Sequence, residues 1–479
     1  MSRGLRHLTA AACCACLAGG CIQGPDYARP EVEIPSAYRF AELPADTLSQ
    51  PAWWNEYRDP HLDVLVREAL VSNRDLRIAS ARVDEFAAIL AGTRSQGFPQ
   101  VGYGLTGSRQ RASEQVIPDF VDPVSSSFGS VLTASWEIDL WGRIRRETEA
   151  ARANLLATEE ARRGITLTLI SSVISSYVTL LDFDAQLRVA LATAEGRRKS
   201  VELFETRLEG GWVSEFEMSQ VRAEYESALQ QIPGIRQVIA TQEHALSVLV
   251  GRNPGSIVRS GEPDELRSPA IPAGLPSDLL LRRPDILQAE QQLIASNALI
   301  GAARALFFPR ISLTGLFGLA SGSLGSLFSG SARTWSFTGD VAGPIYTGGG
   351  LTAAVDQATA RRDQSFASYE LVIQNAFRDV EDALADLRHS AELRDTLRRR
   401  VATLRRGVEL ANERYDNGYS DYLEVLDTER SLFSAELQLA SARGDYQRAL
   451  VNLYRALGGD WTGQPALAAA PAQSGGASR

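Results

Sequence analysis

The sequence predicts a mixed α and β fold that is built twice, with strands and very long helices in each copy. Three observations support this prediction. Short motifs recur at a nearly constant offset along the 479 residues. Each copy joins stretches of alternating apolar and polar residues to helical patterns of coiled-coil type. All four cysteines lie within the first 21 residues, which excludes a disulfide framework in the rest of the chain.

The internal repeat is clearest where the stretch 207–211 recurs at 414–418, an offset of 207 residues (414 − 207). Further pairs keep this register, namely Ile138 with Ile345, Glu217 with Glu424, Leu246 with Leu453, and Gly251 with Gly458. Upstream the offset becomes 210, as in Phe98-Pro99 and Phe308-Pro309. A loop between 99 and 138 can absorb the difference. We therefore predict an internal duplication of one structural unit.

Two hairpins are predicted, at about 100–140 and about 310–346. From Leu132 to Leu140 the apolar residues occupy even positions, and from Trp335 to Ile345 they occupy odd positions. Strands of about ten residues with one apolar face have the length of membrane-crossing β-strands. A half-buried hairpin of a soluble protein has the same period, so the pattern alone leaves both interpretations open.

A long helical pattern follows each hairpin. In the second copy the apolar residues are spaced by fours and threes, as in a coiled-coil seam: Leu393, Leu397, Val401, Leu404, Val408, Ala411 and Tyr415. If residues 349–415 form one helix, it is roughly 100 Å long. An apolar stripe of this length needs helices beside it.

Four predicted strands per chain cannot close a membrane barrel. An open sheet edge in lipid leaves backbone groups unpaired, and the smallest membrane barrels have about eight strands. If the strands cross a membrane, at least two chains therefore share one barrel. The long helices would then pack side by side into a tube below it.

The N-terminus predicts export and lipidation. Arg3 and Arg6 precede a short apolar stretch from Leu8 to Ala18, which is too short to span a bilayer as a helix. The small residues before Cys21 are similar to a lipobox, in which the cysteine carries a covalent lipid. An ordinary signal peptidase site is the alternative. We expect no other cofactor.

Composition excludes several classes of function. The net charge of −9 argues against nucleic-acid binding. The four histidines show no metal-ligand spacing, and no nucleophile or acid–base cluster is apparent, so we expect no catalytic site and no metal site. The single methionine after the signal peptide, Met218, gives no indication of a copper-binding methionine path.

Several motifs together resemble the TolC/OprM/NodT family of outer-membrane efflux proteins. They are Gly24-Pro-Asp-Tyr-Ala-Arg-Pro30, Ser135-Trp-Glu-Ile-Asp-Leu-Trp-Gly-Arg143, Arg282-Arg-Pro-Asp-Ile286, Ile300-Gly-Ala-Ala-Arg-Ala-Leu-Phe-Phe-Pro309 and Leu457-Gly-Gly-Asp-Trp461. The resemblance implies a homotrimer with a twelve-stranded outer-membrane β-barrel, four strands per chain, continued by a long α-helical periplasmic barrel. It also implies an efflux duct that contacts outer-membrane lipid, a periplasmic membrane-fusion adaptor and an inner-membrane RND-type pump.

On this basis we divide the chain into six segments. They are a signal peptide (1–20), a lipid anchor with an extended segment (21–60), a first repeat (61–251), an equatorial linker (252–276), a second repeat (277–458) and a C-terminal tail expected to be disordered (459–479). Each repeat contains helical stretches, a hairpin and a long helix pair.

The resemblance also places a gate at the periplasmic end of the long helices. The gate residues that it implies are Glu217, Tyr415, Leu423, Glu424 and Asp427, and the tip turns for adaptor docking contain Arg207, Gly211, Arg414 and Gly418. In several chains the acidic residues would form rings that favour cations. The alternative is that these acids are solvated helix charges. TolC has an arginine where this chain has Ser420, so a different lock, using Arg207 or Arg414, is considered.

Two other functions remain to be weighed against the efflux duct. One is the exit duct of a type I polypeptide secretion system. The other, of a different class, is a periplasmic coiled-coil scaffold. The alternating strands and Cys21 favour the duct, whereas the transported substrate cannot be read from the sequence because the pump selects it.

Overall fold

The computed structural model describes residues 22–32, 34–35, 38–39, 53–113, 115–116, 118, 120, 122–259, 261–267 and 276–459. The predicted signal peptide, the lipidation site at Cys21 and residues 460–479 of the predicted tail lie outside the described residues. The chain divides into two compact units, and each unit draws on both halves of the sequence. Unit 1 comprises Met1–Glu31, Ala81–Glu159 and Gln288–Glu370, and unit 2 comprises Val32–Ser80, Glu160–Leu287 and Leu371–Arg479.

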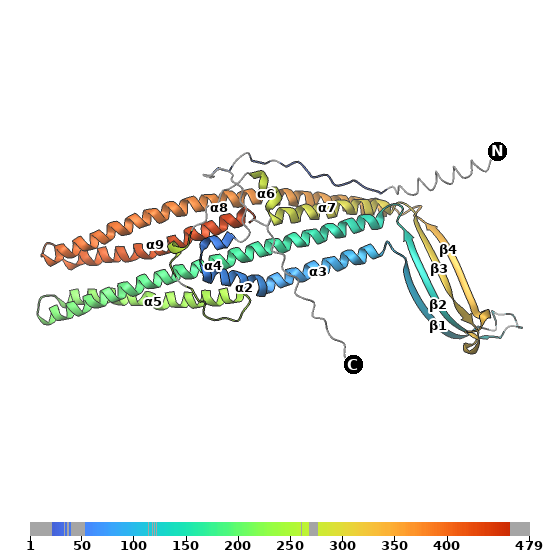
Figure 1. The fold of residues 1–479 in the computed structure, drawn as a ribbon, viewed down its shortest axis with the longest axis horizontal. Helices are drawn as coiled ribbons and strands as arrows, with labels where there is room; N and C mark the ends of the chain where they lie inside the picture. Colours follow the sequence, from blue (N-terminus) through green and yellow to red (C-terminus); the bar gives the residue numbers. More distant parts are fainter. Residues whose placement is uncertain are drawn as a thin grey trace. The chain divides into compact units, whose positions relative to one another are not determined.

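Unit 1 contains an antiparallel sheet of four strands within the described residues (Figure 1). The strands are β1 (Gln100–Arg111), β2 (Val124–Ile138), β3 (Arg310–Ser321) and β4 (Arg333–Ala342). Each strand pairs with the next in chain order, so β1 and β4 are the two edges. The strands fall within the two predicted hairpins.

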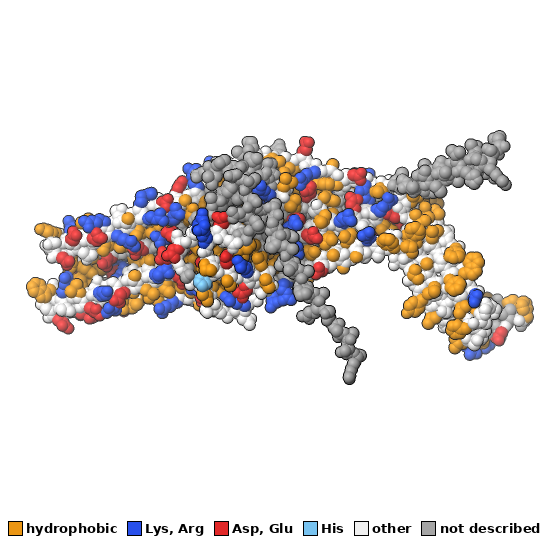
Figure 2. Space-filling model, in the orientation of Figure 1, with side chains coloured by type: hydrophobic (Ala, Val, Ile, Leu, Met, Phe, Trp, Pro, Cys, Tyr) orange, Lys and Arg blue, Asp and Glu red, His pale blue; other side chains and the backbone are white. Residues whose placement is uncertain are grey.

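The register places the large apolar side chains of all four strands on one face. Tyr103 lies opposite Leu132, which lies opposite Phe317, and Phe317 lies opposite Trp335. These side chains are exposed; Tyr103, for example, is 83% exposed. Figure 2 shows hydrophobic side chains gathered over the strands. A sheet face this apolar that the described residues leave exposed is typical of a surface that contacts lipid or another protein.

The helices repeat in length as well as in order. They are α2 (Pro60–Ser72), α3 (Arg74–Ser95), α4 (Arg143–Glu209), α5 (Glu215–Leu249), α6 (Pro276–Arg282), α7 (Pro284–Ala305), α8 (Gly350–Asp416) and α9 (Tyr422–Ala456). α4 and α8 have 67 residues each, and α5 and α9 have 35 residues each. α8 matches the single long helix predicted for 349–415. The starts of α4 and α8 differ by 207 positions (350 − 143), the offset found in the sequence.

A break at Asn73 separates α2 from α3, and the sequence analysis did not predict it. The Asn73 side-chain oxygen accepts the backbone N–H of Leu76 at 2.9 Å and thereby caps the start of α3. Its Nδ2 donates to the Leu249 carbonyl at 2.8 Å, at the end of α5. The Asn73 side chain thus forms hydrogen bonds with the start of α3 and with the end of α5, where backbone groups lack partners within their own helices.

The core of unit 2 includes the most apolar part of α4. Among the described helices, α4 has one 18-residue window that is long and apolar enough to cross a membrane, and 56% of that window is buried inside the protein. Val173, Ile174 and Tyr177 are fully buried here. The Tyr177 hydroxyl donates to Asp59 Oδ2 at 2.6 Å. We therefore interpret the window as packed core.

Candidate functional site

The predicted tip turns join α4 to α5 and α8 to α9 in unit 2. Gly211 and Gly418 both have positive φ, 73° and 75°, which side chains rarely adopt. The N–H that follows each glycine donates to the carbonyl of Arg207 or Arg414, at 2.9 and 2.8 Å. Both helices thus end in the same hydrogen-bonded glycine cap. This local geometry explains why the turn motif recurs in the sequence.

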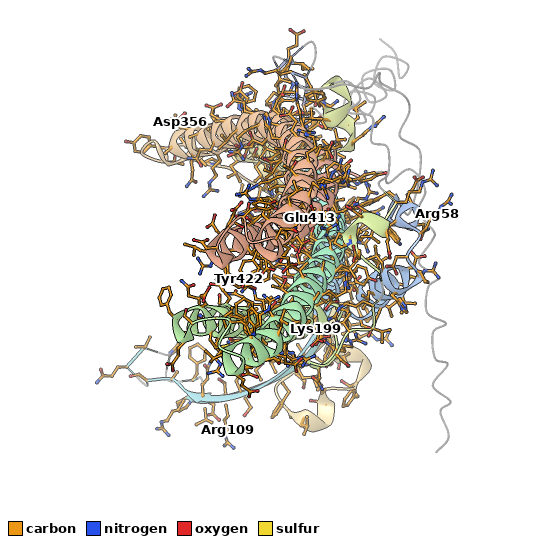
Figure 3. All side chains as sticks on the ribbon, turned by 90° about the vertical axis from the view of Figure 1, so that its left-hand side faces the viewer. Arg58, Arg109, Lys199, Asp356, Glu413 and Tyr422 are labelled. Atoms are coloured by element: carbon orange, nitrogen blue, oxygen red, sulfur yellow. The ribbon has the colours of Figure 1, made fainter. Side chains whose placement is uncertain are left out.

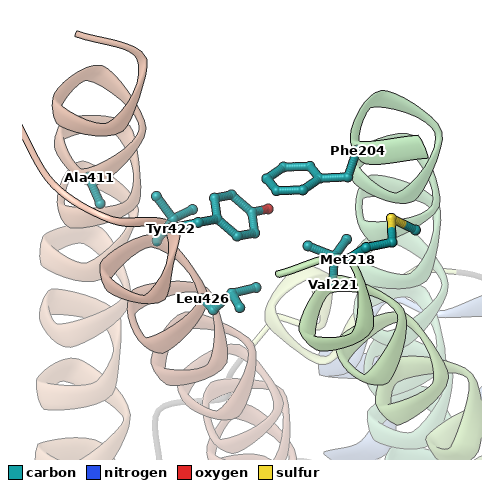
Figure 4. Packing of buried hydrophobic residues seen from close by; sticks show 7 residues of the cluster. Phe204, Met218, Val221, Ala411, Tyr422 and Leu426 are labelled. Carbon is teal, nitrogen blue, oxygen red and sulfur yellow. The ribbon is translucent and has the colours of Figure 1, made fainter. Parts of the chain in front are cut away.

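A hydrophobic core holds the two helix pairs together near these turns. Phe204 of α4 and Met218 of α5 are about 1% exposed and face residues of the other pair. The rings of Phe204 and Tyr422 have their centroids 4.3 Å apart (Figure 4). Figure 3 views the same end of the helices with all side chains and labels Tyr422. Burial raises the pKa of the Tyr422 hydroxyl to about 12, so it stays neutral at physiological pH.

Arg207 forms the polar contact between the pairs at this level. Its Nη1 donates to the Tyr415 hydroxyl at 3.3 Å, and its Nη2 lies 3.7 Å from Asp416 Oδ1. The guanidinium carbon lies 5.6 Å from the ring centroids of both Phe204 and Tyr415, within cation–π range. One arginine of α4 therefore contacts the last turn of α8 through charge, a hydroxyl and a ring.

The predicted acidic residues have different environments. Arg414 Nε lies 3.2 Å from Glu424 Oε1, so Glu424 is paired within its own helix pair. Glu217 accepts the Ser214 N–H at 2.7 Å and completes a capping box at the start of α5. Asp427 is exposed and makes no ion pair with another described residue. Of these three predicted acids, Asp427 is the one whose carboxylate has no described hydrogen-bond or ion-pair partner.

The remaining gate residues predicted from the sequence have the following surroundings within one chain. Leu423 is exposed on α9, as expected for a residue facing a lumen or solvent. Within one chain, Glu217 bonds Ser214 and Tyr415 bonds Arg207.

A second charged cluster, which the sequence analysis missed, lies further along the same helices. Glu224 of α5 is paired with Arg197 of α4 at 3.1 Å and with Arg430 of α9 at 2.6 Å. Arg197 Nη1 also donates to the Glu224 carbonyl at 2.6 Å. Glu429 is adjacent, and burial raises the pKa of its carboxyl group. Little in the sequence indicated this charged cluster, because charged residues on a long helix usually face solvent.

The N-terminal motif of residues 24–30 packs against α7 within unit 1. A Cβ on Gly24 would lie 2.4 Å from the Gly301 Cα, so both positions need glycine. Arg29 Nε donates to Glu290 Oε1 at 2.8 Å. Arg146, which is nearly fully buried, donates to Asp26 Oδ1 at 2.8 Å. The motifs at 24–30 and 300–309 therefore meet where the extended segment packs on the helices.

The Arg-Arg-Pro-Asp motif is a helix start with a buried arginine. α7 begins at Pro284, as the sequence predicts. Arg283 Nη2 donates to Asp285 at 2.7 Å and to Asp379 of α8 at 3.1 Å. Its Nη1 donates to the Ala456 carbonyl at 2.9 Å, at the end of α9. These contacts join the start of α7 to the end of α9 and to the middle of α8, so they give the motif a structural role within unit 2.

Comparison with known proteins shows which family this chain matches. The family model described as "Outer membrane efflux protein" matches residues 65–252 and 275–459. The Probable efflux pump outer membrane protein TtgC of Pseudomonas putida is 37% identical over 472 residues, covering 96% of this chain and 97% of TtgC. The Cation efflux system protein CusC of Escherichia coli is 38% identical over 456 residues, covering 94% of this chain and 98% of CusC.

Solved structures agree. A crystal structure of CusC superposes with a TM-score of 0.83 at 37% identity and covers 91% of this chain and 99% of that chain. The open state of the Neisseria gonorrhoeae MtrE outer membrane channel superposes with a TM-score of 0.82 at 31% identity, covering 92% and 98%. The chain is therefore a channel of the outer membrane that extends into the periplasm and works with the other components of an efflux pump. It belongs to the outer membrane efflux protein family.

Proposed function

We propose that three copies of this chain form one duct, with a shared barrel of twelve strands continued by a helical tube in the periplasm. The observation that supports this proposal is the open sheet. Within the described residues β1 and β4 each lack a partner along one edge, while the sheet face bearing Tyr103 and Trp335 is apolar and exposed. In lipid, both edges need partners, and neighbouring copies can supply them without any further chain.

The duct receives its substrates from a periplasmic membrane-fusion adaptor and an inner-membrane RND-type pump, which selects them. The tip turns at Gly211 and Gly418 are the surface that we assign to adaptor docking. We assign no catalytic or metal-dependent step to the chain and no cofactor besides a lipid at Cys21. The equal lengths of α4 and α8, and a family model that matches both halves, support an origin by internal duplication.

Efflux is favoured over polypeptide secretion by the names of the relatives. These include an antibiotic efflux pump protein, a toluene efflux pump protein and a cation efflux system protein. The buried position of Met218 leaves it unavailable as an exposed thioether ligand in the folded tip.

Chemical cross-linking tests the proposed assembly. The purified protein in detergent, treated with increasing amounts of a carboxyl-reactive cross-linker, is expected to give a ladder of bands that stops at three chains. The matched measurement is the mass of the untreated complex by light scattering. A ladder that stops at two, or a single chain that inserts stably into bilayers, would contradict the shared barrel.

A further inference from the structure

A hollow of about 400 Å³ lies in unit 1 where β1 and β2 meet the ends of α3 and α4. Its walls combine apolar and charged side chains, including Arg94, Phe98, Trp136, Asp139, Ile144 and Arg145. None of these residues is needed for the proposed gate or for the strand edges. The hollow is therefore a separate feature, and its chemistry can be considered by itself.

The hollow begins where the apolar face of the sheet ends. Trp136 lies opposite Leu313 of β3, on the face that also bears Tyr103. The Trp136 Nε1 donates to the Gly97 carbonyl at 3.0 Å, which fixes the indole in the wall of the hollow that also includes the exposed Phe98. Tryptophan at the end of an apolar band is typical of the boundary between hydrocarbon and headgroups. The hollow is thus at the depth where lipid headgroups are expected.

The charged side chains that line the hollow differ in whether they already have partners within the chain. Arg145 is held by its own loop, since Nη2 donates to the carbonyls of Asp139 at 2.9 Å and Leu140 at 3.2 Å. The Asp139 carboxylate accepts the backbone N–H groups of Ile144 at 3.1 Å and Arg145 at 2.9 Å, so its charge is compensated at the start of α4. Arg94 is exposed in the last turn of α3 and forms no ion pair with a described side chain. Arg94 is the free donor.

We propose that the hollow binds the phosphate of a membrane phospholipid. Arg94 donates to the phosphate oxygens, while Arg145 stays paired with Asp139, whose Oδ2 lies 3.4 Å from the Arg145 Nε. Phe98, Trp136 and Ile144 contact the glycerol and the first carbons of an acyl chain. This inference rests on the proposed membrane embedding of the sheet, because that embedding brings a lipid to the apolar wall. Basic pockets at the membrane boundary that bind headgroups follow the same physical rule.

A phospholipid fits the hollow better than a soluble anion, because the apolar wall of the hollow is continuous with the apolar face of the sheet. The apolar wall of Trp136 and Phe98 continues the exposed sheet face, so a bound molecule has both a charged end and an apolar end to satisfy. Inorganic phosphate would contact only the arginine side. A lipid on Cys21 would compete with the phospholipid for the hollow. Ile22, the next residue, packs closely on Gly142, since a Cβ at position 142 would lie 3.2 Å from the Ile22 Cα.

Native mass spectrometry of the detergent-solubilised complex tests the proposal. Phosphatidylglycerol is expected to remain bound, at up to one molecule per chain, while diacylglycerol with the same acyl chains and inorganic phosphate are not retained. Arg94→Gln is expected to weaken retention about fivefold, the effect of one arginine near an anionic headgroup. Arg94→Lys should restore most of it. Arg82→Gln, on the same helix outside the hollow, is the matched control and should change nothing.

Three results would overturn the proposal. They are equal retention of diacylglycerol, unchanged retention by Arg94→Gln, and retention that appears only in Cys21→Ser, which would make the chain's own lipid the occupant. The spectrum also reports the number of chains. A complex of three chains without bound phospholipid would reject this site and leave the proposed duct standing.

Discussion

At the scale of single residues, the tip depends on Arg207 more than on its acidic neighbours. Arg207 contacts Tyr415 and Asp416, whereas Glu424 is paired within its own helix pair and Asp427 faces solvent. Surface ion pairs by themselves contribute little to stability. The Arg207 guanidinium also packs on the rings of Phe204 and Tyr415, which adds contact beyond the ion pair. The contact between the pairs at this level is therefore a packing contact as much as a charged one.

Tyr415→Phe removes the hydroxyl that accepts from Arg207 while keeping the ring against Phe204. We expect the resting conductance of single channels in planar bilayers to rise. A loss of about 1 kcal/mol, ordinary for one hydrogen bond, corresponds to roughly fivefold more of the open state. Tyr419→Phe, which removes an exposed hydroxyl at the same tip, is the control. Equal effects of both variants would show that the Arg207 contact does not restrain the tip.

Glu429→Gln tests the buried charge cluster through its pH dependence. Burial raises the Glu429 pKa, the Glu224 charge raises it further, and Arg197 opposes the shift. The folded chain therefore binds this proton more tightly than the unfolded chain. The resulting stability is fully present below the ordinary glutamate value of 4.5 and is lost as pH rises through the folded pKa.

We expect Glu429→Gln to raise the thermal unfolding midpoint by a few degrees at pH 8 and to have little effect at pH 4.5, because glutamine resembles the protonated acid. Circular dichroism melts across this range measure the difference. The control is Glu226→Gln, an exposed acid of α5. A pH-independent difference, or the same change in the control, would mean that Glu429 is not a buried titrating group.

Cys21→Ser tests the anchor. The parent should show an acylated N-terminal cysteine by mass spectrometry of the mature protein, and the variant should not. We expect the variant still to form channels, because the apolar sheet face gives the protein a second means of holding the membrane. An unmodified parent that begins at another residue would remove the lipid from the proposal.

At the scale of elements, the position of a residue along α9 decides which way its side chain faces. Leu423 and Asp427 are one turn apart and both exposed, so copies of this helix around an axis would present rings of leucine and aspartate. Like charges at a constriction attract cations and oppose closure. The hydrophobic core around Phe204 and Tyr422 lies beside them and offsets that repulsion.

Replacing Glu424 and Asp427 together by alanine is expected to reduce the cation preference and the divalent-ion sensitivity of the channel in bilayer recordings. Asp427→Ala alone should account for most of the change, since Glu424 is already paired with Arg414. Glu215→Ala with Glu209→Ala, two acids near the other turn, is the control for net charge. A double variant that kept its selectivity would place the selectivity element elsewhere.

At the scale of the whole molecule, the proposed assembly depends on the two edges of the sheet. β1 and β4 are separated by three strand spacings, about 14 Å, which exceeds the distance that a disulfide can bridge. Any disulfide between the two edges must therefore join different chains.

Engineered cysteines use this fact in a Cys21→Ser background. Thr106 of β1 and Ser336 of β4 lie on the same face of the sheet, opposite the apolar one. Thr106→Cys with Ser336→Cys, and with Thr334→Cys or Thr338→Cys to allow for register, is expected to give an oxidised ladder that ends at three chains. Each cysteine alone is the control and should not pass two chains. If no register gave cross-linked chains, the closure by neighbouring edges would be wrong.

The sequence by itself determined the order, type and approximate length of the elements. The 207-residue offset, the period-two stretches and the seam from Leu393 to Tyr415 depend on local backbone geometry, which the chain expresses wherever it folds. The glycine turns at Gly211 and Gly418 were predictable for the same reason, because a positive φ selects glycine locally.

Only the tertiary structure decided which charges meet and which are buried. Glu224 and Arg430 are 206 positions apart, and nothing in either local pattern marks them as partners. The break at Asn73 arose in the same way, since its side chain bonds a carbonyl 176 positions away. Ion pairs, caps shared between helices and the hollow beside Trp136 depend on distances between remote segments. Those distances are set by packing, which periodicity in a single sequence does not contain.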